Sequence, residues 1–429
     1  MPPTSFGART LARELPLHIG EQVFLQGWLH HTRNLRTVDF LLLRDHSGIA
    51  QVIVENQQQR ERLATLPHES VLSVEGTVVA SAQAPGGVEL HDPKITPISV
   101  PAEEPPFELF RPSLDVQLPT RLDHAAVSLR HPASVATQKL TAAAMRGFRA
   151  ILDSYGFTEI QTPKLLETAP EGGANVFKVD YFGRDAFLAQ SPQLYKQIMV
   201  GALERVYEVA PAFRAEPHDT GRHVSQYLSL DAELGFIESH QDVMRVVRDV
   251  LAAMTSEMRL VEAASISIPQ VPDEIPQIHF RDALAFLDAP ENEPDLSPGH
   301  ERALGEWAVR EHGSAWLFVT GYPMAKRPFY THPEPGEPRW SNSFDVLCMG
   351  LEITTGGQRL HHYPDYLAAI EARDMDPAPF RGYLEAFRHG MPPHGGFAIG
   401  LERMVKQIVG AANVREVMLF PRDMQRLAP

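Results

Sequence analysis

Residues 213–223 read FRAEPHDTGRH, and this stretch decides the interpretation of the chain. It lies between two runs that favour β structure, residues 206–209 and 228–233, and the residues that join them are polar. The pattern predicts an antiparallel hairpin with Arg214 on one strand and Arg222 in the loop. Because a guanidinium can meet phosphate oxygens through two parallel hydrogen bonds, the hairpin predicts a nucleotide site. The alternative is a structural ion pair from Arg214 to a nearby glutamate, either Glu216 or Glu233.

A second arginine follows a glycine-rich run near the end of the chain. Residues 394–400, HGGFAIG, precede Leu401, Glu402 and Arg403, and apolar residues then recur at helical spacing. Arg403 would project from the first turn of this helix, and the glycines would let the backbone approach a flat ligand. The alternative is a buried C-terminal helix with glycine packing, and the apolar stripe is core in either case.

The run AQSPQLYKQ, residues 189–197, predicts the start of another helix. Ser191 is a good N-cap and Pro192 a good first residue. Gln193 and Lys196 would then share one face near the positive end of the helix, where they present an amide and an ammonium to a small anion. The alternative is a capped surface helix with an exposed lysine.

Oxygen ligands occur together in residues 352–359, EITTGGQR. Glu352 supplies a carboxylate and Thr355 a hydroxyl, and Arg359 follows two glycines. Such ligands suit a Mg²⁺ ion that bridges phosphates and keeps several waters. A single carboxylate is a weak metal signal, and Asp345 could either join it or pair with a basic side chain.

Bulk properties are those of a soluble globular protein. The 429 residues are enough for two or three domains, with 43% hydrophobic and 22% charged residues. No apolar run is long enough to span a bilayer and no leader precedes the first domain, so we expect no membrane partner. The single Cys348 excludes an intrachain disulfide and a zinc-binding cysteine cluster, and favours a cytoplasmic setting. The net charge of −15 averages over the whole surface, so it leaves an RNA partner open.

The first hundred residues predict a small closed β-barrel of the OB type, with one helical stretch between its third and fourth strands. The five strand-like runs are residues 22–29, 40–45, 49–54, 71–79 and 88–90. A proline-rich stretch follows. We therefore expect a barrel domain at 1–104, a hinge at 105–133 and a second domain at 134–429. That domain begins with a helix near 134–155 and lacks the regular βαβ alternation and Gly-rich turn of a dinucleotide fold.

Together these runs resemble the class II aminoacyl-tRNA synthetases, and among them the aspartyl-tRNA synthetases of the compact archaeal and eukaryotic type. Residues 156–163, GFTEIQTP, match the first motif of that family, whose proline, here Pro163, lies at a homodimer interface. The stretches around Arg214 and Arg403 match the second and third motifs. The resemblance covers essentially the whole chain. It implies an α+β fold: an OB barrel for the anticodon, then a catalytic domain built on an antiparallel sheet flanked by helices.

By that resemblance, ATP is a substrate and Mg²⁺ the cofactor. Arg214 would bind the α-phosphate and orient the attacking carboxylate of aspartate, and Arg403 would bind the γ-phosphate, so these two are the expected catalytic residues. Glu352 and the Thr355 hydroxyl would hold Mg²⁺. No side chain needs to act as nucleophile or base, because the reaction depends on positioning two anions and neutralising charge. The other implied ATP-binding residues are Ala215, Glu216, Arg222, His223, Val224, Gly400, Leu401 and Glu402.

The resemblance also implies how L-aspartate is chosen. Lys196 and Arg359 would clamp its side-chain carboxylate, and Glu171 and Gln193 would lie near its ammonium, with Arg214 and Thr355 completing the site. A pocket built on such polar pairing can discriminate by about 10⁴–10⁵ without editing. The asparaginyl enzymes carry an apolar residue at the position of Lys196 and are the second interpretation. A paralogue that does not charge tRNA is a further alternative.

In the barrel, the resemblance assigns the anticodon to Phe40, Gln51 and Glu89. Phe40 would stack on a splayed base, while Gln51 and Glu89 would read base edges. The alternative for Phe40 is a residue of the barrel core.

Two barrel positions depart from the relatives that are specific for tRNA-Asp. Where those carry Trp and Lys, this chain has His30 and Pro85. We therefore hypothesise a non-discriminating enzyme that aspartylates tRNA-Asp and tRNA-Asn, with a tRNA-dependent amidotransferase completing the latter product. Smaller departures are Ala398 for a glycine, and Thr354 and Thr355 for serines.

Overall fold

The computed structural model describes residues 9–167, 175–217, 220–261 and 266–428. It divides the chain into two compact units, residues 1–133 and 134–429. The predicted hinge at 105–133 therefore falls within the first unit, and its role as a hinge stays a prediction.

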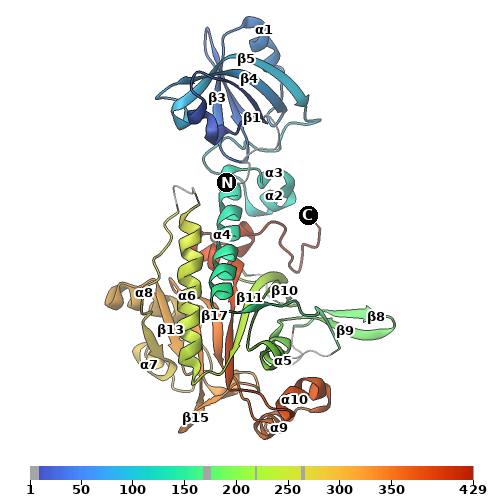
Figure 1. The fold of residues 1–429 in the computed structure, drawn as a ribbon, viewed down its shortest axis with the longest axis vertical. Coiled ribbons are helices and arrows are strands. Elements are labelled where there is room, and N and C mark those ends of the chain that lie inside the picture. The colour runs from blue at the N-terminus through green and yellow to red at the C-terminus, as the bar shows by residue number, and fades with distance from the viewer. Residues whose placement is uncertain (1–8, 168–174, 218–219, 262–265, 429) are drawn as a thin grey trace. The chain divides into compact units, whose positions relative to one another are not determined.

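The first unit contains a closed five-stranded barrel in the order β1-β2-β3-β5-β4, with α1 between β3 and β4 (Figure 1). Its elements are β1 (Gln22–Asn34), β2 (Asp39–Arg44), β3 (Ile49–Val54), α1 (Gln57–Leu63), β4 (Val71–Ala80) and β5 (Val88–Ser99). The predicted OB-type barrel is confirmed. β1 runs five residues beyond its predicted end at 29, because residues 31–34 continue to pair with β2 past a bulge at His30.

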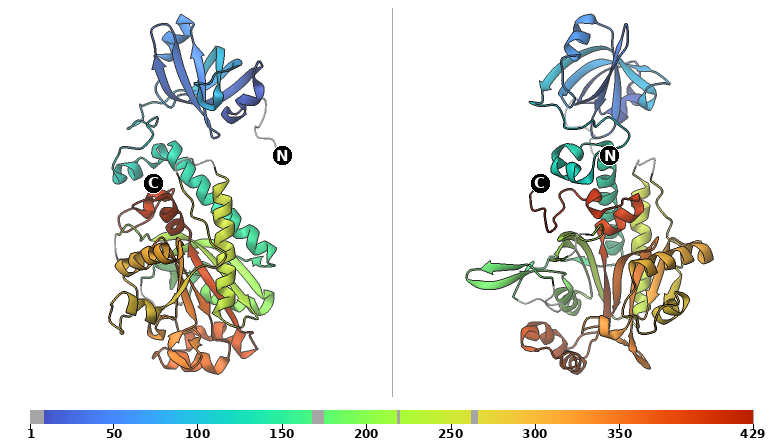
Figure 2. Two further views of the ribbon diagram at one scale, coloured as in Figure 1. Left: turned by 90° about the vertical axis from the view of Figure 1, so that its left-hand side faces the viewer. Right: turned by 180° about the vertical axis from the view of Figure 1, so that it is seen from behind.

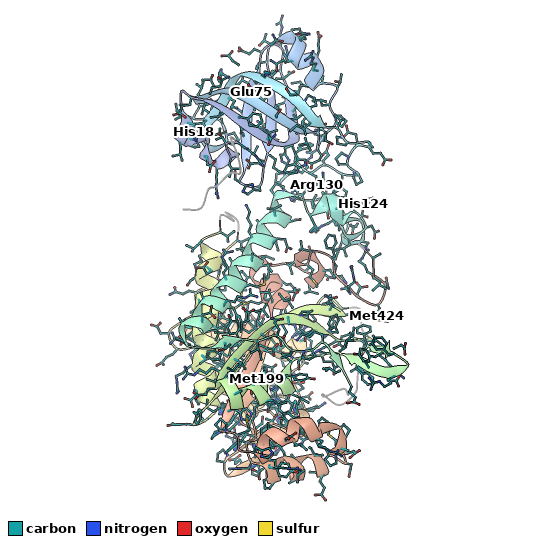
Figure 3. All side chains as sticks on the ribbon, turned by 45° about the vertical axis from the view of Figure 1, so that its right-hand side comes forward. His18, Glu75, His124, Arg130, Met199 and Met424 are labelled. Carbon is teal, nitrogen blue, oxygen red and sulfur yellow. The ribbon has the colours of Figure 1, made fainter. Side chains whose placement is uncertain are left out.

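Alternating residues fill the barrel. Leu41 and Leu43 of β2 are buried in its core, as are Val52 and Val54 of β3. The other face of each strand points outward, as Glu75 of β4 does where it pairs with Lys94 at 3.2 Å (Figure 3). The register of each strand therefore decides which side chains a ligand on the barrel surface can meet.

Short helices occur around and after the barrel strands. Where the sequence predicted only a proline-rich hinge, the structure has α2 (Leu118–Asp123) and α3 (Ala125–Ser128). The 3₁₀ turns η1 (Ala12–His18) and η2 (Pro85–Gly87) lie before β1 and before β5.

The second unit is built on an eight-stranded sheet in the order β12-β13-β16-β17-β18-β11-β10-β6. Pairing is antiparallel except for the β12–β13 and β10–β6 pairs at its two edges, so the predicted α+β class is confirmed. The strands are β6 (Thr158–Glu159), β10 (Arg205–Phe213), β11 (Gln226–Gly235), β12 (Gln277–His279), β13 (Trp316–Thr320), β16 (Ser343–Cys348), β17 (Leu351–Gln358) and β18 (His394–Gly400).

Two long helices, α4 (Pro132–Ser154) and α6 (His240–Arg259), lie side by side across one face of this sheet (Figures 1 and 2). Their apolar faces join the sheet in one buried cluster. At their crossing, a Cβ on Gly147 would lie 2.6 Å from the carbonyl oxygen of Ala253, so only glycine permits this approach. The helix predicted near 134–155 is confirmed, and it begins two residues earlier.

The remaining elements surround the sheet. A small sheet, β7-β9-β8, projects from the body of this unit (Figures 1 and 2). No helix in the described residues is long and apolar enough to cross a membrane. These elements are β7 (Leu165–Leu166), β8 (Lys178–Tyr181), β9 (Arg184–Leu188), α5 (Gln193–Leu203), α7 (Phe280–Phe286), α8 (Pro298–His312), η3 (Met324–Lys326), β14 (Pro333–Glu334), β15 (Glu337–Ser341), α9 (Tyr363–Glu371), η4 (Ala378–Phe380), α10 (Arg381–Arg388), α11 (Leu401–Val409) and η5 (Val414–Val417).

Candidate active site

A pocket of about 450 Å³ lies in the second unit, and β11, β17 and β18 all contribute to its wall. Charged side chains from separate segments line it, including Arg214, Glu352, Arg359 and Arg403. Both arginines singled out in the sequence are therefore brought into one cavity.

Arg214 follows the last residue of β10, and its backbone N–H donates to Ser225 O at 2.9 Å, which extends the β10–β11 ladder. The predicted hairpin is confirmed. The guanidinium lies 5.7 Å from the ring centroid of Tyr227, within range of a cation–π contact. Glu233, one of the two partners suggested for Arg214, pairs instead with Arg359 and Lys196.

The loop of this hairpin is held by the C-terminal segment. Val414 N–H donates to Gly221 O at 2.8 Å, and Ser225 N–H donates to Arg422 O at 2.7 Å. Arg415 donates to Thr220 O at 3.1 Å. Residues almost two hundred positions later in the chain thus fix the backbone of a loop that lines the pocket.

Arg222, also in this loop, pairs with Glu301 of α8, whose two carboxylate oxygens lie 2.8 and 3.0 Å from Nη2. In the same loop, His223 Nδ1 is 2.7 Å from Thr220 Oγ1. Both Arg222 and His223 line the pocket.

The carboxylate of Glu352 and the hydroxyl of Thr355 lie together because β17 has a bulge. Residues three apart on a regular strand face opposite sides. Here Thr354 pairs with Val346 and Glu352 with Leu347, so Ile353 is an extra residue. The Thr355 hydroxyl consequently donates to Glu352 Oε1 at 3.2 Å.

Asp345 on the neighbouring strand β16 adds a second carboxylate, opposite Thr355. Burial and the charge of Glu352 raise its pKa to about 6, although the nearby Arg327 lowers it. Two neighbouring carboxylates with a hydroxyl beside them fit a hard divalent cation. The described residues hold no group of three or more His, Cys, Asp or Glu that could bind a metal through protein ligands alone.

Arg403 lies in the first turn of α11, as predicted, and Gly400 is the N-cap of that helix. Its Nη1 donates to Glu352 O at 3.2 Å and is 3.4 Å from Glu352 Oε1. Both carboxylate oxygens of Glu402 lie 3.0 Å from Leu228 N, and burial raises the pKa of Glu402 to about 7. Glu402 therefore connects the start of α11 to β11, and Arg403 contacts Glu352, one of the two candidate metal ligands.

A buried charge cluster includes Arg359, which lines the same pocket as Arg214 and Arg403. The Glu233 carboxylate is 2.9 Å from Arg359 Nε and 3.4 Å from Lys196 Nζ. Lys196 also donates to Asp231 Oδ1 at 3.0 Å and to Phe397 O at 3.0 Å. Burial would raise the pKa of Glu233, but the two cations hold it below its usual value. The Lys196 side chain is 1% exposed, so the alternative of a surface lysine is wrong.

A family model described as tRNA synthetases class II (D, K and N) matches residues 117–424, and one described as an OB-fold nucleic acid binding domain matches residues 23–98. The chain belongs to the class II tRNA synthetases. The aspartate–tRNA(Asp/Asn) ligase of Thermus thermophilus is 47% identical over 98% of this chain and 100% of its own length. That of Deinococcus radiodurans is 45% identical over 98% of this chain and 99% of its own.

Among solved structures, the asparaginyl-tRNA synthetase of Pyrococcus horikoshii complexed with asparaginyl-adenylate matches with a TM-score of 0.91 at 30% identity. The match covers 99% of this chain and 100% of that one. The resemblance predicted from the motifs is confirmed at the level of the family.

Most residues predicted for the synthetase site line the one pocket: Gln193, Arg214, Glu216, Arg222, His223, Val224, Glu352, Thr355, Arg359, Gly400, Glu402 and Arg403. Three do not. Lys196 lies behind Asp231, Leu401 is buried in the apolar core, and Ala215 donates its N–H to Asn175 O at 2.7 Å. Glu171 lies outside the described residues.

One local prediction about this site is wrong. Helix α5 begins at Gln193 with Pro192 as its N-cap, not at Pro192 with Ser191 as its N-cap. The Ser191 hydroxyl still accepts the Gln193 N–H at 3.2 Å, because a serine two residues before an N–H can reach it in a turn as well as in a cap.

Some pocket residues were missed by the sequence reasoning. Ser229, Asp231 and Glu233 are polar residues two positions apart on one face of β11. This period of two is a signal that could have identified Ser229 and Asp231. Tyr227 lies on the same face of β11 and shares that signal. The others come from chain segments without a local pattern: Lys326, Arg327, Pro328, Tyr330, Thr331, Ser343 and Val414.

In the barrel of the synthetase, Phe40, Gln51 and Glu89 lie on the outer face. Phe40 is half-buried and lies outside the core cluster, so the barrel-core alternative is wrong. Gln51 pairs with Glu89 across β3 and β5, and its Nε2 donates to Glu89 Oε2 at 2.8 Å.

The two positions linked to tRNA-Asn differ in exposure. Pro85 is exposed in the turn between β4 and β5. His30 is only 5% exposed, and its Nδ1 is 3.1 Å from Arg44 Nη1. Burial and the charge of Arg44 lower the pKa of His30 to about 4. Pro163, predicted for the dimer interface, is exposed on the second unit.

Proposed function

We propose that the chain attaches L-aspartate to tRNA-Asp and tRNA-Asn by way of aspartyl-adenylate. One observation carries this proposal: a single pocket contains two arginines suited to phosphates and, beside them, an arginine of a buried carboxylate–cation cluster. The names of the relatives from Thermus thermophilus and Deinococcus radiodurans support both the amino acid and the pair of tRNAs.

Arg214 and Arg403 would hold opposite ends of the triphosphate of ATP. Arg214 extends from the end of β10 and Arg403 from the first turn of α11, so each is anchored on a regular element. Arg214 would neutralise the α-phosphate and align the aspartate carboxylate for attack, and Arg403 would bind the γ-phosphate. Catalysis then comes from fixed positions and charge, without a protein nucleophile.

Glu352 and the Thr355 hydroxyl would hold Mg²⁺, and Asp345 is close enough in the sheet to contribute. When bound, the ion would neutralise phosphate charge as pyrophosphate leaves. The bulge in β17 holds the two oxygen donors on one side of the strand.

Aspartate would be selected by Arg359, which lines the pocket and is held by Glu233. Lys196 adds a second positive charge to the same cluster, and Gln193 would lie near the substrate ammonium. Asparagine would offer these cations an amide, which accepts hydrogen bonds more weakly and brings unwanted donors.

On the barrel, Phe40, Gln51 and Glu89 would contact the anticodon, and Pro85 would leave room at its third base. The product on tRNA-Asn would require a tRNA-dependent amidotransferase. We further propose that the enzyme is a cytoplasmic homodimer with Pro163 at its interface.

The test is aminoacylation of purified tRNA-Asp and tRNA-Asn transcripts with labelled aspartate, ATP and Mg²⁺, together with amino-acid-dependent exchange of pyrophosphate into ATP. We expect exchange with aspartate and charging of both transcripts. Charging of tRNA-Asp alone would contradict the relaxed tRNA specificity. Exchange with asparagine and none with aspartate would overturn the assignment of the amino acid.

A further inference from the structure

Glu301 is an acidic side chain that the motifs do not include. It lies in the first turn of α8, and its side chain is 7% exposed. Both of its oxygens accept hydrogen bonds from Arg222 Nη2, at 3.0 and 2.8 Å. A buried carboxylate with this geometry restricts the guanidinium far more than a surface pair would.

The same carboxylate makes a third contact. Its Oε2 accepts the backbone N–H of Glu352 at 3.1 Å. Glu301 therefore bridges the hairpin loop that carries Arg222 and the strand that carries the oxygen donors.

The backbone fixes where Glu301 stands. Helix α8 packs directly on the turn between β16 and β17, where a Cβ on Gly305 would lie 2.4 Å from Gly350 N. A Cβ on Gly350 would lie 2.8 Å from the Cα of Arg302. The two glycines let the backbones of α8 and the turn touch directly. This close packing fixes the position of α8, and with it the position of Glu301.

Arg222 has capacity left for a ligand. Within the described part of the chain, its Nη1 and Nε donate no hydrogen bond, while Nη2 is committed to Glu301. Arg222 lines the pocket together with Arg403. Burial and the charges of both arginines lower the pKa of Lys406, while Glu416 raises it, so the three cations are near enough to affect one another.

These cations repel one another when no nucleotide neutralises them. A buried anion beside Arg222 offsets part of that repulsion and keeps the guanidinium directed into the pocket. We propose that Glu301 is a positioning residue that holds Arg222 ready for the phosphates of ATP. This inference rests on ATP being the ligand of the pocket, as the proposed function has it.

The first test compares Glu301→Gln with Glu306→Gln in the full chain. Glu306 is exposed on the same helix, so its substitution is a matched control. Titration calorimetry with ATP and Mg²⁺ should show binding about tenfold weaker for Glu301→Gln, since a neutral hydrogen bond replaces a charge-assisted one and the amide keeps part of the interaction. The control should bind as the unsubstituted chain does. The KM for aspartate should stay unchanged, which a merely structural role would not allow.

A double-mutant cycle with Arg222→Ala tests whether Glu301 affects ATP binding through Arg222. If Glu301 acts through Arg222, Glu301→Gln should weaken ATP binding no further once Arg222 is alanine. Unchanged ATP binding in Glu301→Gln would overturn the proposal, and so would an additive loss in the double variant or an equal loss of aspartate affinity. ATP binding is measured without amino acid or tRNA, so a wrong assignment of the amino acid would leave this test intact.

Discussion

At the scale of single residues, Glu233 is the carboxylate that pairs with the buried Arg359, and it shares Lys196 with Asp231. It is fully buried between Arg359 and Lys196. Arg359 could not be placed so deep without Glu233, because an unpaired buried charge carries a large desolvation cost.

Replacing Glu233 by Gln should therefore damage both stability and substrate binding. Breaking a buried pair by removing one partner costs about 3–5 kcal/mol, so we expect a fall of about this size in the free energy of unfolding, measured by urea denaturation. The KM for aspartate in pyrophosphate exchange should rise, because Arg359 loses its anchor. Glu238→Gln, at an exposed position just after the same strand, is the control. Normal stability in Glu233→Gln would contradict the importance of the pair.

His394 is a second buried titratable residue, at the start of β18. Burial lowers its pKa to about 4, with Arg359 acting in the same direction and Glu233 against it. Its Nδ1 is 3.0 Å from Pro392 O and its Nε2 is 3.1 Å from Gln197 Oε1.

The lowered pKa of His394 predicts a loss of stability in mild acid. In the unfolded chain the imidazole binds a proton below its ordinary pKa of 6.5, whereas in the folded chain it stays neutral down to about 4. Its contribution is therefore complete above 6.5 and lost as pH falls from 6.5 to about 4, up to about 3 kcal/mol. Urea denaturation across this range should show a shallower dependence on pH for His394→Gln than for the exposed control His389→Gln. Equal slopes would show that another group carries the effect.

At the scale of elements, the approach of α4 to α6 depends on one missing side chain. A Cβ at Gly147 would meet the backbone of Ala253 and Met254 at 2.6–2.8 Å. Since backbone cannot rotate away as a side chain can, the helices must separate to admit it.

Gly147→Ala should accordingly destabilise the second unit. We expect a loss of about 1–3 kcal/mol, even though alanine is the better helix former. Gly382→Ala in α10 is the matched control, because no atom lies within 4 Å of its Cβ position. Thermal unfolding should show a lower midpoint for the first variant, and an equal or higher midpoint for the second. A neutral Gly147→Ala would mean that the helices do not pack this closely.

The bulge in β17 decides whether two oxygen donors of the pocket lie together. Without the extra Ile353, Glu352 and Thr355 would face opposite sides of the sheet. The spacing of the two oxygen donors is readable in the sequence, but the bulge that brings them together is not.

At the scale of the whole molecule, the residues proposed to choose the tRNA lie in the first unit, and those proposed to choose the amino acid lie in the second. Of the two barrel positions associated with tRNA-Asn, Pro85 is exposed and His30 is buried against Arg44. A tryptophan at 30 would have to displace Arg44 from Glu69, to which it donates two hydrogen bonds of 2.9 and 2.8 Å. A substitution at Pro85 therefore tests the proposed tRNA specificity with less disturbance of the barrel than a substitution at His30.

We expect Pro85→Lys to lower the charging of tRNA-Asn several-fold relative to tRNA-Asp, with aspartate-dependent pyrophosphate exchange unchanged. A lysine adds bulk and charge at the predicted third-base position. Gln83→Lys, in the same exposed turn, adds the same charge two residues away and is the control. If both variants changed the two tRNAs equally, the added charge alone would account for the result.

The sequence by itself determined the barrel, a few local elements of the second unit and the family. The five-stranded barrel, the hairpin around Arg214, the helix after Gly400 and the motif order are all local patterns, because periodicity and turn residues act over a few positions. Their local character is why these predictions are confirmed, and why element ends such as those of β1 and α5 were missed.

Only the tertiary structure decided which charges meet. Arg222 and Glu301 are 79 residues apart, and Arg359 and Glu233 are 126 apart. The burial of Lys196 and His30 likewise depends on partners from other strands. No local pattern encodes such pairs, because a buried charge is stable only beside a partner that folding brings to it from a distant part of the chain.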